Sequence, residues 1–360
     1  MRVDEESGGE SREVLAELEG LTLSVSTREG EIFPVFGVSF SISRGEVVGL
    51  VGESGSGKTL TGLSLLRLFP PRSTVLSGRI LFEKRNLLEL GDNEMRTIRG
   101  NRIAMIFQEP QSALNPILTV GTQLKELFKS HTDFPESTVK ERILSRLRSA
   151  GLPDPESVFR SYPHQLSGGM RQRVMIAMAI ALDPLLVIAD EPTTALDPTV
   201  ASQILDLLAS IRDTRDKGLL FISHDLSHVR RISDRILVMY AGKIIESAQS
   251  RKFFGNAPRH PYSRALLASR PSDARKTRQD GPLTAITGQV PPLWDLPAGC
   301  AFAPRCPKAE EICRRETPPW KGSESEGALC FFPEEPMDQG LGQWPGQPSK
   351  ENSMDSLHAC

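Results

Sequence analysis

A glycine-rich segment at residues 52–59, GESGSGKT, constrains the fold of this chain more than any other feature. It matches the pattern G-x-x-x-x-G-K-[ST], in which glycines let the backbone curl so that its N–H groups face a phosphate. The apolar run EVVGLV precedes it at residues 46–51, and a helix is expected over residues 61–69. This order of strand, loop and helix argues against a glycine-rich turn that matches the pattern by chance. The segment therefore predicts a nucleotide-binding α/β domain.

The loop pattern also assigns roles to single residues. Lys58 would reach the β- and γ-phosphates, and Thr59 would offer its hydroxyl to Mg²⁺. The residues expected to surround the phosphates of the nucleotide are Gly52, Ser54, Gly55, Ser56, Gly57, Lys58 and Thr59.

Two later segments, residues 185–189 and 219–223, form nearly continuous apolar runs, with only Ser223 polar at the end of the second. Such runs are typical of central strands in a parallel sheet that is covered on both faces. Further strands are expected at residues 21–25, 35–42, 78–82 and 102–107, with a hairpin at residues 235–245. Strands that alternate with helices predict a mainly parallel α/β sheet.

Between residues 119 and 150 the pattern becomes helical. Val139, Ile143 and Leu147 recur every four residues, with charged residues between them. This spacing predicts a surface helical insert with one apolar stripe.

Composition narrows the class of protein. The chain has 360 residues, of which 39% are hydrophobic and 24% charged, as in soluble globular proteins of two or three domains. A formal net charge of −2 gives no basic field, so nucleic acid is not expected as a partner. No stretch approaches eighteen apolar residues, and the acidic first residues lack the apolar core of a signal peptide. We therefore expect a protein of the cytosol, or of the cytosolic side of a larger assembly.

The octapeptide LSGGMRQR at residues 166–173 points to one kind of ATPase. It is part of an ordered set of motifs that resembles the ATP-binding subunit of an ABC transporter. The other members of the set are the loop, Gln108, residues 185–191, the segment TALD at residues 194–197 and His224. The resemblance covers roughly residues 20–245, whereas a P-loop kinase would lack the octapeptide. It implies an ABC-type ATPase domain with a mainly parallel sheet, an antiparallel β subdomain and a helical insert at about residues 110–175.

The same set supplies candidate catalytic residues. Asp190 ends the apolar strand beside the loop, where a carboxylate can hold Mg²⁺ directly or through water. The resemblance implies that Glu191 polarises the attacking water and that His224 contacts the γ-phosphate. It also implies that Gln108 lies within reach of Mg²⁺ and of that water, and that Asp197 lies close to the nucleotide.

Ser167, Gly168 and Gly169 open a helix expected over residues 170–182, and helix N-termini favour phosphate. In the family that this chain resembles, the phosphate belongs to ATP held by the opposite subunit. Because the chain carries one set of motifs, the resemblance implies a second ATPase subunit, in a heterodimer or a homodimer.

One position departs from the family pattern. Where these ATPases usually place an aromatic residue against adenine, this chain has Val25. Phe33 or Phe36 could take that role, or weaker apolar contacts could hold the base.

The cysteines are concentrated late in the chain. None precedes Cys300, and Cys300, Cys306, Cys313 and Cys330 have the spacing C-x5-C-x6-C-x16-C. In a reducing cytosol such a cluster indicates metal rather than disulfides, and four thiolates suit an iron–sulfur cluster or zinc. Structural cysteines without a ligand are the remaining interpretation. Cys360 lies in a polar tail and is not expected to be a ligand.

Segments after the ATPase motifs indicate a subfamily. RHPYSRALL at residues 259–267, GQVPP at residues 288–292 and PAGCAFAPRCP at residues 297–307 resemble the C-terminal extension of the oligopeptide/dipeptide/nickel importers. For dipeptide-type members the resemblance implies a [4Fe–4S] cluster on the four clustered cysteines.

These observations predict an ATPase that powers the import of short peptides. Its partners would be two membrane permease subunits and, indirectly, a solute-binding protein, at the cytoplasmic face of a bacterial inner membrane. Nickel or another small solute is an alternative cargo. A soluble ABC ATPase is a further alternative, although the long coiled-coil insertions, zinc hooks or paired ATPase domains typical of that class are not seen. The expected organisation is a flexible N-terminus at residues 1–19, an ATPase domain at 20–255, an extension at 256–333 and a disordered tail at 334–360.

Overall fold

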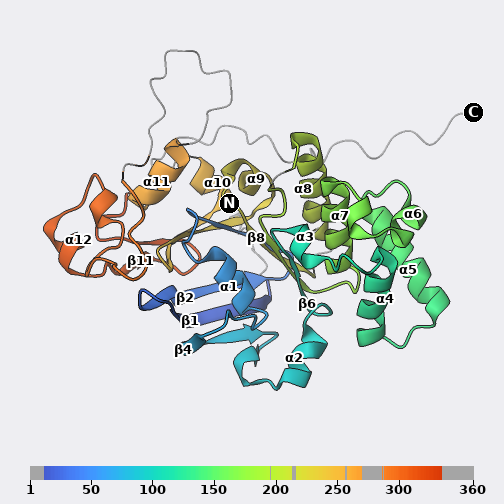
Figure 1. Cartoon of the computed structure of the whole chain (residues 1–360). Helices are drawn as coiled ribbons and strands as arrows, with labels where there is room; N and C mark the ends of the chain where they lie inside the picture. Colours follow the sequence, from blue (N-terminus) through green and yellow to red (C-terminus); the bar gives the residue numbers. More distant parts are fainter. Residues whose placement is uncertain are drawn as a thin grey trace, which may run out of the picture.

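Two β-sheets form the framework of the protein, and helices cover the larger one (Figure 1). This computed structural model describes residues 12–194, 196–212, 216–255, 258–269, 286 and 288–334. Within them, one sheet has four strands in the order β2-β1-β4-β5, and the other has eight in the order β11-β12-β10-β9-β3-β8-β7-β6. The expected α/β architecture is confirmed.

The smaller sheet is antiparallel. It consists of β1 (Val14–Ser26), β2 (Glu31–Ser43), β4 (Ser73–Phe82) and β5 (Arg85–Asn86). β1 begins earlier than the expected domain start at residue 20, because Leu15, Ala16 and Leu18 are buried against the rest of the core. Residues 14–19, expected to be flexible, therefore form part of the sheet, while residues 1–11 of that expected segment lie outside the described residues.

The larger sheet has a parallel centre. Its parallel strands are β3 (Val47–Val51), β6 (Ile103–Ile106), β7 (Leu186–Asp190), β8 (Gly218–Ile222) and β9 (Arg235–Tyr240). Every residue of these strands is buried, as the unbroken apolar runs predicted. β10 (Lys243–Gln249) turns back antiparallel to β9, which confirms the expected hairpin.

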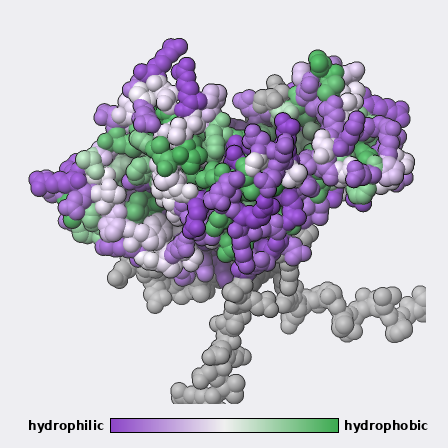
Figure 2. Space-filling view, turned by 90° about the horizontal axis from the view of Figure 1, so that it is seen from below, coloured by the Kyte–Doolittle hydropathy of each residue, from purple (hydrophilic) through white to green (hydrophobic). Residues whose placement is uncertain are grey.

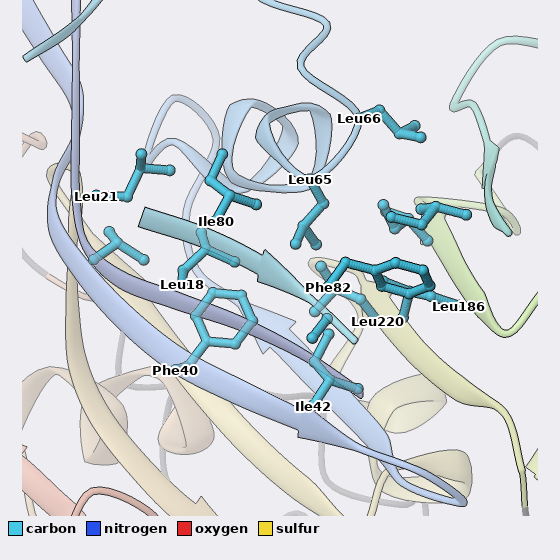
Figure 3. Packing of buried hydrophobic residues seen from close by; sticks show 14 of the residues in the cluster. Leu18, Leu21, Phe40, Ile42, Leu65, Leu66, Ile80, Phe82, Leu186 and Leu220 are labelled. Carbon is cyan, nitrogen blue, oxygen red and sulfur yellow. The ribbon is translucent and has the colours of Figure 1, made fainter. Parts of the chain in front are cut away.

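Two hydrophobic cores cover the two faces of the parallel centre. On one face, residues of the smaller sheet and of the segment after α1 (Lys58–Ser64) pack against Leu186 and Leu220 (Figure 3). On the other face lie α7 (Gly168–Ala179), α8 (Pro198–Arg212) and α9 (Leu226–Ile232). The carboxyl ends of β3, β7 and β8 are thus fixed between two packed layers, and the candidate site lies at these ends.

A third core holds the helical insert together. The insert comprises α3 (Pro110–Ala113), α4 (Val120–His131), α5 (Glu136–Ser149), α6 (Pro155–Arg160) and the 3-10 turn η2 (Pro163–Gln165). Val139, Ile143 and Leu147 are the buried residues of α5, as their spacing predicted. Outside the insert, η1 (Leu87–Glu89) and α2 (Asp92–Ile98) connect β5 to β6.

The C-terminal extension is joined to the large sheet. α10 (Ser250–Phe254) precedes the extension, whose own elements are α11 (Pro261–Ala268), η3 (Ala303–Arg305), α12 (Glu311–Arg315), β11 (Trp320–Gly322) and β12 (Gly327–Leu329). β12 pairs with β10, so the extension continues the larger sheet. Figure 2 shows the extension and the insert as two lobes on opposite sides of a largely hydrophilic surface. Of the expected tail at residues 334–360, residues 335–360 lie outside the described residues.

Candidate functional site

The glycine-rich loop connects β3 to α1 and depends on glycine at both ends. Gly52 and Gly57 have φ angles of 157° and 104°. A Cβ atom at Gly52 would lie 2.2 Å from the carbonyl oxygen of Met239, and one at Gly57 would lie 1.9 Å from that of Pro34. Any side chain at these two positions would displace backbone, so the curled loop requires glycine there.

Lys58 lies folded into the loop. Its Nζ donates hydrogen bonds to the carbonyl oxygens of Gly52 and Glu53, each at 2.9 Å. Burial lowers the pKa of Lys58, while Glu191 and Asp190 act in the opposite direction. The ammonium group is thus positioned between the loop and two carboxylates, where an anionic ligand would meet it.

Asp190 and Thr59 form the candidate Mg²⁺ site. Asp190 is 2% exposed at the end of β7, and the hydroxyl of Thr59 is hydrogen-bonded to it. Burial raises the pKa of Asp190, and its Oδ1 atom has no hydrogen-bond partner. A buried carboxylate oxygen without a partner costs free energy unless a ligand satisfies it. A divalent cation would satisfy this oxygen, and the assignment of the two residues to Mg²⁺ stays a prediction.

Three predicted catalytic residues meet at Glu191. Its Oε2 atom lies 3.4 Å from Nε2 of Gln108 and 3.0 Å from Nδ1 of His224. Glu191 also has a φ of 46°, which is uncommon for a residue with a side chain and is typical of functional sites. Three segments far apart in sequence thus bring a carboxylate, an amide and an imidazole together next to Asp190.

A fourth residue joins this group without having been assigned a role from the sequence. Thr194 donates a hydrogen bond from Oγ1 to Oε2 of Glu191 at 2.9 Å. Its position three residues after Glu191, at the turn that follows β7, is the local signal that could have identified it.

The residues of the octapeptide lie at the surface. Ser167 is the N-cap of α7, and its Oγ accepts a hydrogen bond from the N–H of Met170 at 3.3 Å. Ser167 and Gly168 are exposed, and Gly169 is half-buried. Asp197 is exposed as well and accepts a hydrogen bond from Val200 at 3.0 Å, inside its own segment. The side chains of Ser167 and Asp197 thus accept hydrogen bonds from the helices that follow them in the sequence, and the N-terminus of α7 faces solvent.

The region expected to hold adenine is occupied by β1 and β2. Val25 is half-buried in β1, opposite Ile32. Phe36 is 43% exposed, its ring meets that of Phe33 edge-on at 5.8 Å, and Nζ of Lys243 lies 4.8 Å from its centre. The assignment of the base to any of these residues stays a prediction.

The four clustered cysteines converge, although they are separated by up to sixteen residues of intervening chain. Cys300, Cys306, Cys313 and Cys330 line one cavity of about 20 Å³, together with His260 and Phe302. Burial raises the pKa of the Cys330 thiol to about 11. A space of this size holds about one water molecule.

The arrangement does not support the expected metal centre. Among the residues that the structure describes, no group of three or more His, Cys, Asp or Glu side chains is arranged to hold a metal ion. The [4Fe–4S] cluster and the zinc ion predicted for these thiols therefore have no preformed site. Cys360 lies outside the described residues.

Over the described ranges, every helix is too short or too polar to cross a bilayer. The chain also has relatives of known family. The family model for the ABC transporter matches residues 35–194, and that for the oligopeptide/dipeptide transporter C-terminal region matches residues 245–313.

Individual relatives agree with these family models. A probable peptide ABC transporter ATP-binding protein of Sinorhizobium fredii is 48% identical over 78% of this chain and 84% of its own length. The dipeptide transport ATP-binding protein DppD of Bacillus subtilis is 45% identical over 85% of this chain and 90% of its own length. Among solved structures, the dimeric bacterial ABC transporter cassette MJ0796 matches with a TM-score of 0.60 and 29% identity, covering 66% of this chain and 99% of that one.

Proposed function

This chain belongs to the ATP-binding subunits of ABC transporters, and we propose that it hydrolyses ATP to power the import of short peptides. One observation carries the hydrolytic part of the proposal. The carboxylate of Glu191 meets Gln108 and His224 directly beside the buried Asp190 and the loop lysine. The peptide cargo is supported by the match to the oligopeptide/dipeptide transporter C-terminal region and by relatives named for peptide or dipeptide transport.

Each group in the site has a chemical task in this proposal. The N–H groups of residues 52–59 and the ammonium of Lys58 bind the phosphates. Asp190 and Thr59 would hold Mg²⁺, which would neutralise negative charge on the phosphates. Glu191 orients the attacking water and takes up its proton, while Gln108 and His224 position Glu191 and the γ-phosphate.

We propose that the active form is a dimer of ATPase subunits. The exposed N-terminus of α7 presents Ser167, Gly168 and Gly169 away from the core of the chain. Free N–H groups and the partial positive charge of a helix N-terminus favour a phosphate, which a second subunit would supply together with its ATP. That subunit is either a similar ATPase chain or a second copy of this one. The dimeric relative MJ0796 supports this arrangement.

A surface groove next to Gln108 fits the attachment of the permease subunits. It has a volume of about 230 Å³, and its wall is mostly apolar, formed by Leu68, Phe107, Leu127, Met178 and their neighbours. Phe107 precedes Gln108, and Leu127 belongs to the helical insert. We propose that an apolar helix end of one permease inserts here, and that the second permease binds the second ATPase subunit. The chain would then lie at the cytoplasmic face of the membrane, with a solute-binding protein acting on the far side.

The cysteine cavity is proposed as a metal site on the basis of its donor set alone. Four thiols that line one cavity are a donor set that suits a [4Fe–4S] cluster or zinc. Iron, acid-labile sulfide and zinc should be measured in anaerobically purified protein. About four iron and four sulfide per chain would support the cluster, and one zinc per chain would support the alternative. Protein that contains neither metal would support the interpretation as structural cysteines without a ligand.

Nucleotide binding provides the first test of the proposal. Lys58→Ala should weaken the affinity for a fluorescent ATP analogue at least tenfold, because a cation that contacts the phosphates is removed. Lys129→Ala, which removes an exposed lysine from the last turn of α4, is the matched control and should bind normally. Equal affinities for the two variants would refute the assignment of the loop to ATP.

A further inference from the structure

Glu53 is a variable position of the loop pattern, yet all its polar groups are engaged. Its carbonyl oxygen accepts a hydrogen bond from Nζ of Lys58 at 2.9 Å. Its N–H donates to Oη of Tyr262 at 3.0 Å. Its carboxylate accepts from Nη1 of Arg305, with its two oxygens at 3.0 and 3.2 Å. Lys58 belongs to the loop itself, but Tyr262 and Arg305 belong to the C-terminal extension, in α11 and η3.

The two partners from the extension are held in place by their own surroundings. The Arg305 side chain is only 4% exposed, and Nη1 also lies 3.3 Å from Oη of Tyr240. The rings of Tyr240 and Tyr262 lie 4.7 Å apart, and Phe302 packs edge-on against both. Tyr240, Tyr262 and Phe302 are each at most 1% exposed. The guanidinium and the phenol are therefore fixed before any nucleotide arrives.

The charges explain why such a contact matters. Glu53 places a carboxylate inside a loop that is built to receive a polyphosphate, and like charges at short range repel. The guanidinium of Arg305 compensates this carboxylate, and the Tyr262 hydroxyl fixes the backbone at the same residue. A loop that is already ordered loses less conformational entropy when its ligand binds.

We propose that Arg305 and Tyr262 are positioning residues of the ATP site, through which the C-terminal extension holds the phosphate loop in its binding shape. Neither residue reaches the phosphates; both act through Glu53. ATP affinity then depends on the extension, even though the expected ATPase motifs all lie before residue 225. This inference rests on the proposed assignment of residues 52–59 to ATP.

The test compares two links between the core and the extension. Arg305→Met breaks the link to Glu53, whereas Lys252→Met breaks the ion pair of Lys252 with Glu326, at 2.7 and 2.8 Å, which lies away from the loop. Full-length protein is examined by equilibrium binding of a fluorescent ATP analogue, by steady-state ATP hydrolysis and by thermal melting. A purely structural role of Arg305 would lower the melting temperature of Arg305→Met and leave its ATP affinity equal to that of Lys252→Met.

We expect Arg305→Met to raise the Kd and the KM for ATP about tenfold, equivalent to about 1.4 kcal/mol, with little change in kcat. Adding Glu53→Gln should restore most of the affinity, because the uncompensated charge is gone. Arg305→Lys should retain part of it, since a cation remains without the paired N–H geometry. Lys252→Met should bind ATP like the wild type.

Unchanged ATP affinity in Arg305→Met would overturn the proposal, as would a loss that Glu53→Gln fails to relieve. If Arg305→Met does not fold, Tyr262→Phe removes a single hydroxyl and should raise the Kd about threefold; unchanged affinity there would count equally against the proposal. Lys58→Ala is measured alongside. Normal ATP binding by Lys58→Ala would refute the assignment of the loop to ATP. If Lys58→Ala binds ATP weakly and Arg305→Met binds it normally, only the role of the extension is refuted.

Discussion

Replacing Glu191 by Gln removes one charge and almost no volume, so it isolates the chemistry of the candidate base. General-base catalysis contributes about 10²–10⁴ to a rate, which corresponds to about 3–5 kcal/mol of activation free energy. Gln108, His224 and Thr194 all lie within hydrogen-bond distance of Oε2, so the lost charge also weakens their alignment. We therefore expect kcat to fall by at least about 10³.

The same substitution should spare ATP binding, because Lys58, Thr59 and Asp190 are unchanged. Phosphate release is measured in a single turnover with enzyme in excess, and affinity is measured with a fluorescent ATP analogue. Asp190→Asn is the contrasting variant, in which Mg²⁺-dependent binding and hydrolysis should both decline. A kcat within tenfold of the wild type for Glu191→Gln, or a parallel loss of ATP affinity, would refute the role assigned to this carboxylate.

Three further predictions test other parts of the molecule. Ser167→Arg should abolish turnover while ATP still binds to the variant's own loop, and loss of that binding would contradict the composite site. Burial lowers the pKa of His260 from 6.5 to about 3, so only the unfolded chain binds this proton between those values. The free energy of unfolding in urea should therefore fall by at most about 4 kcal/mol as the pH decreases from 6.5 toward 3. The fall should be less steep in His260→Asn. Equal dependence of stability on pH in the wild type and in His260→Asn would refute this prediction. Arg235→Met removes the guanidinium that lies 2.8 Å from the buried Glu46 carboxylate and should cost about 3–5 kcal/mol of stability. A second change, Glu46→Gln, should restore most of this loss. No recovery in the double variant would argue against an unpaired charge as the cause.

Much of the site could be predicted because its residues stand at strand ends. In a parallel sheet the carboxyl ends of neighbouring strands share one edge. The loop after β3, Asp190 and Glu191 at the end of β7, and His224 after β8 must therefore be close. Unbroken apolar runs identified these strands, and their register then brought the polar residues together. The periodicity of residues 139–147 identified the buried face of α5 for an equally local reason.

Contacts between distant segments could not be predicted in this way. Arg305 is 252 residues from Glu53, and nothing in the local pattern of either residue indicates the other. The short strands β11 and β12 are defined by their pairing with each other and by the pairing of β12 with β10, rather than by their own sequence. For the cysteines, the spacing predicted that they converge, but thiol geometry depends on the packing of loops around them, and the expected metal site was not found among the described residues.

The most direct test of the proposed function is peptide uptake by cells whose own gene for this chain carries Glu191→Gln. The uptake of radiolabelled di- and tripeptides is measured beside that of nickel ions and of a free amino acid, in these cells and in cells with the wild-type gene. The proposal predicts that uptake of short peptides falls to the level of a gene deletion while nickel and amino-acid uptake are unchanged. Normal peptide uptake in the variant would contradict it, and a selective loss of nickel uptake would assign the other cargo.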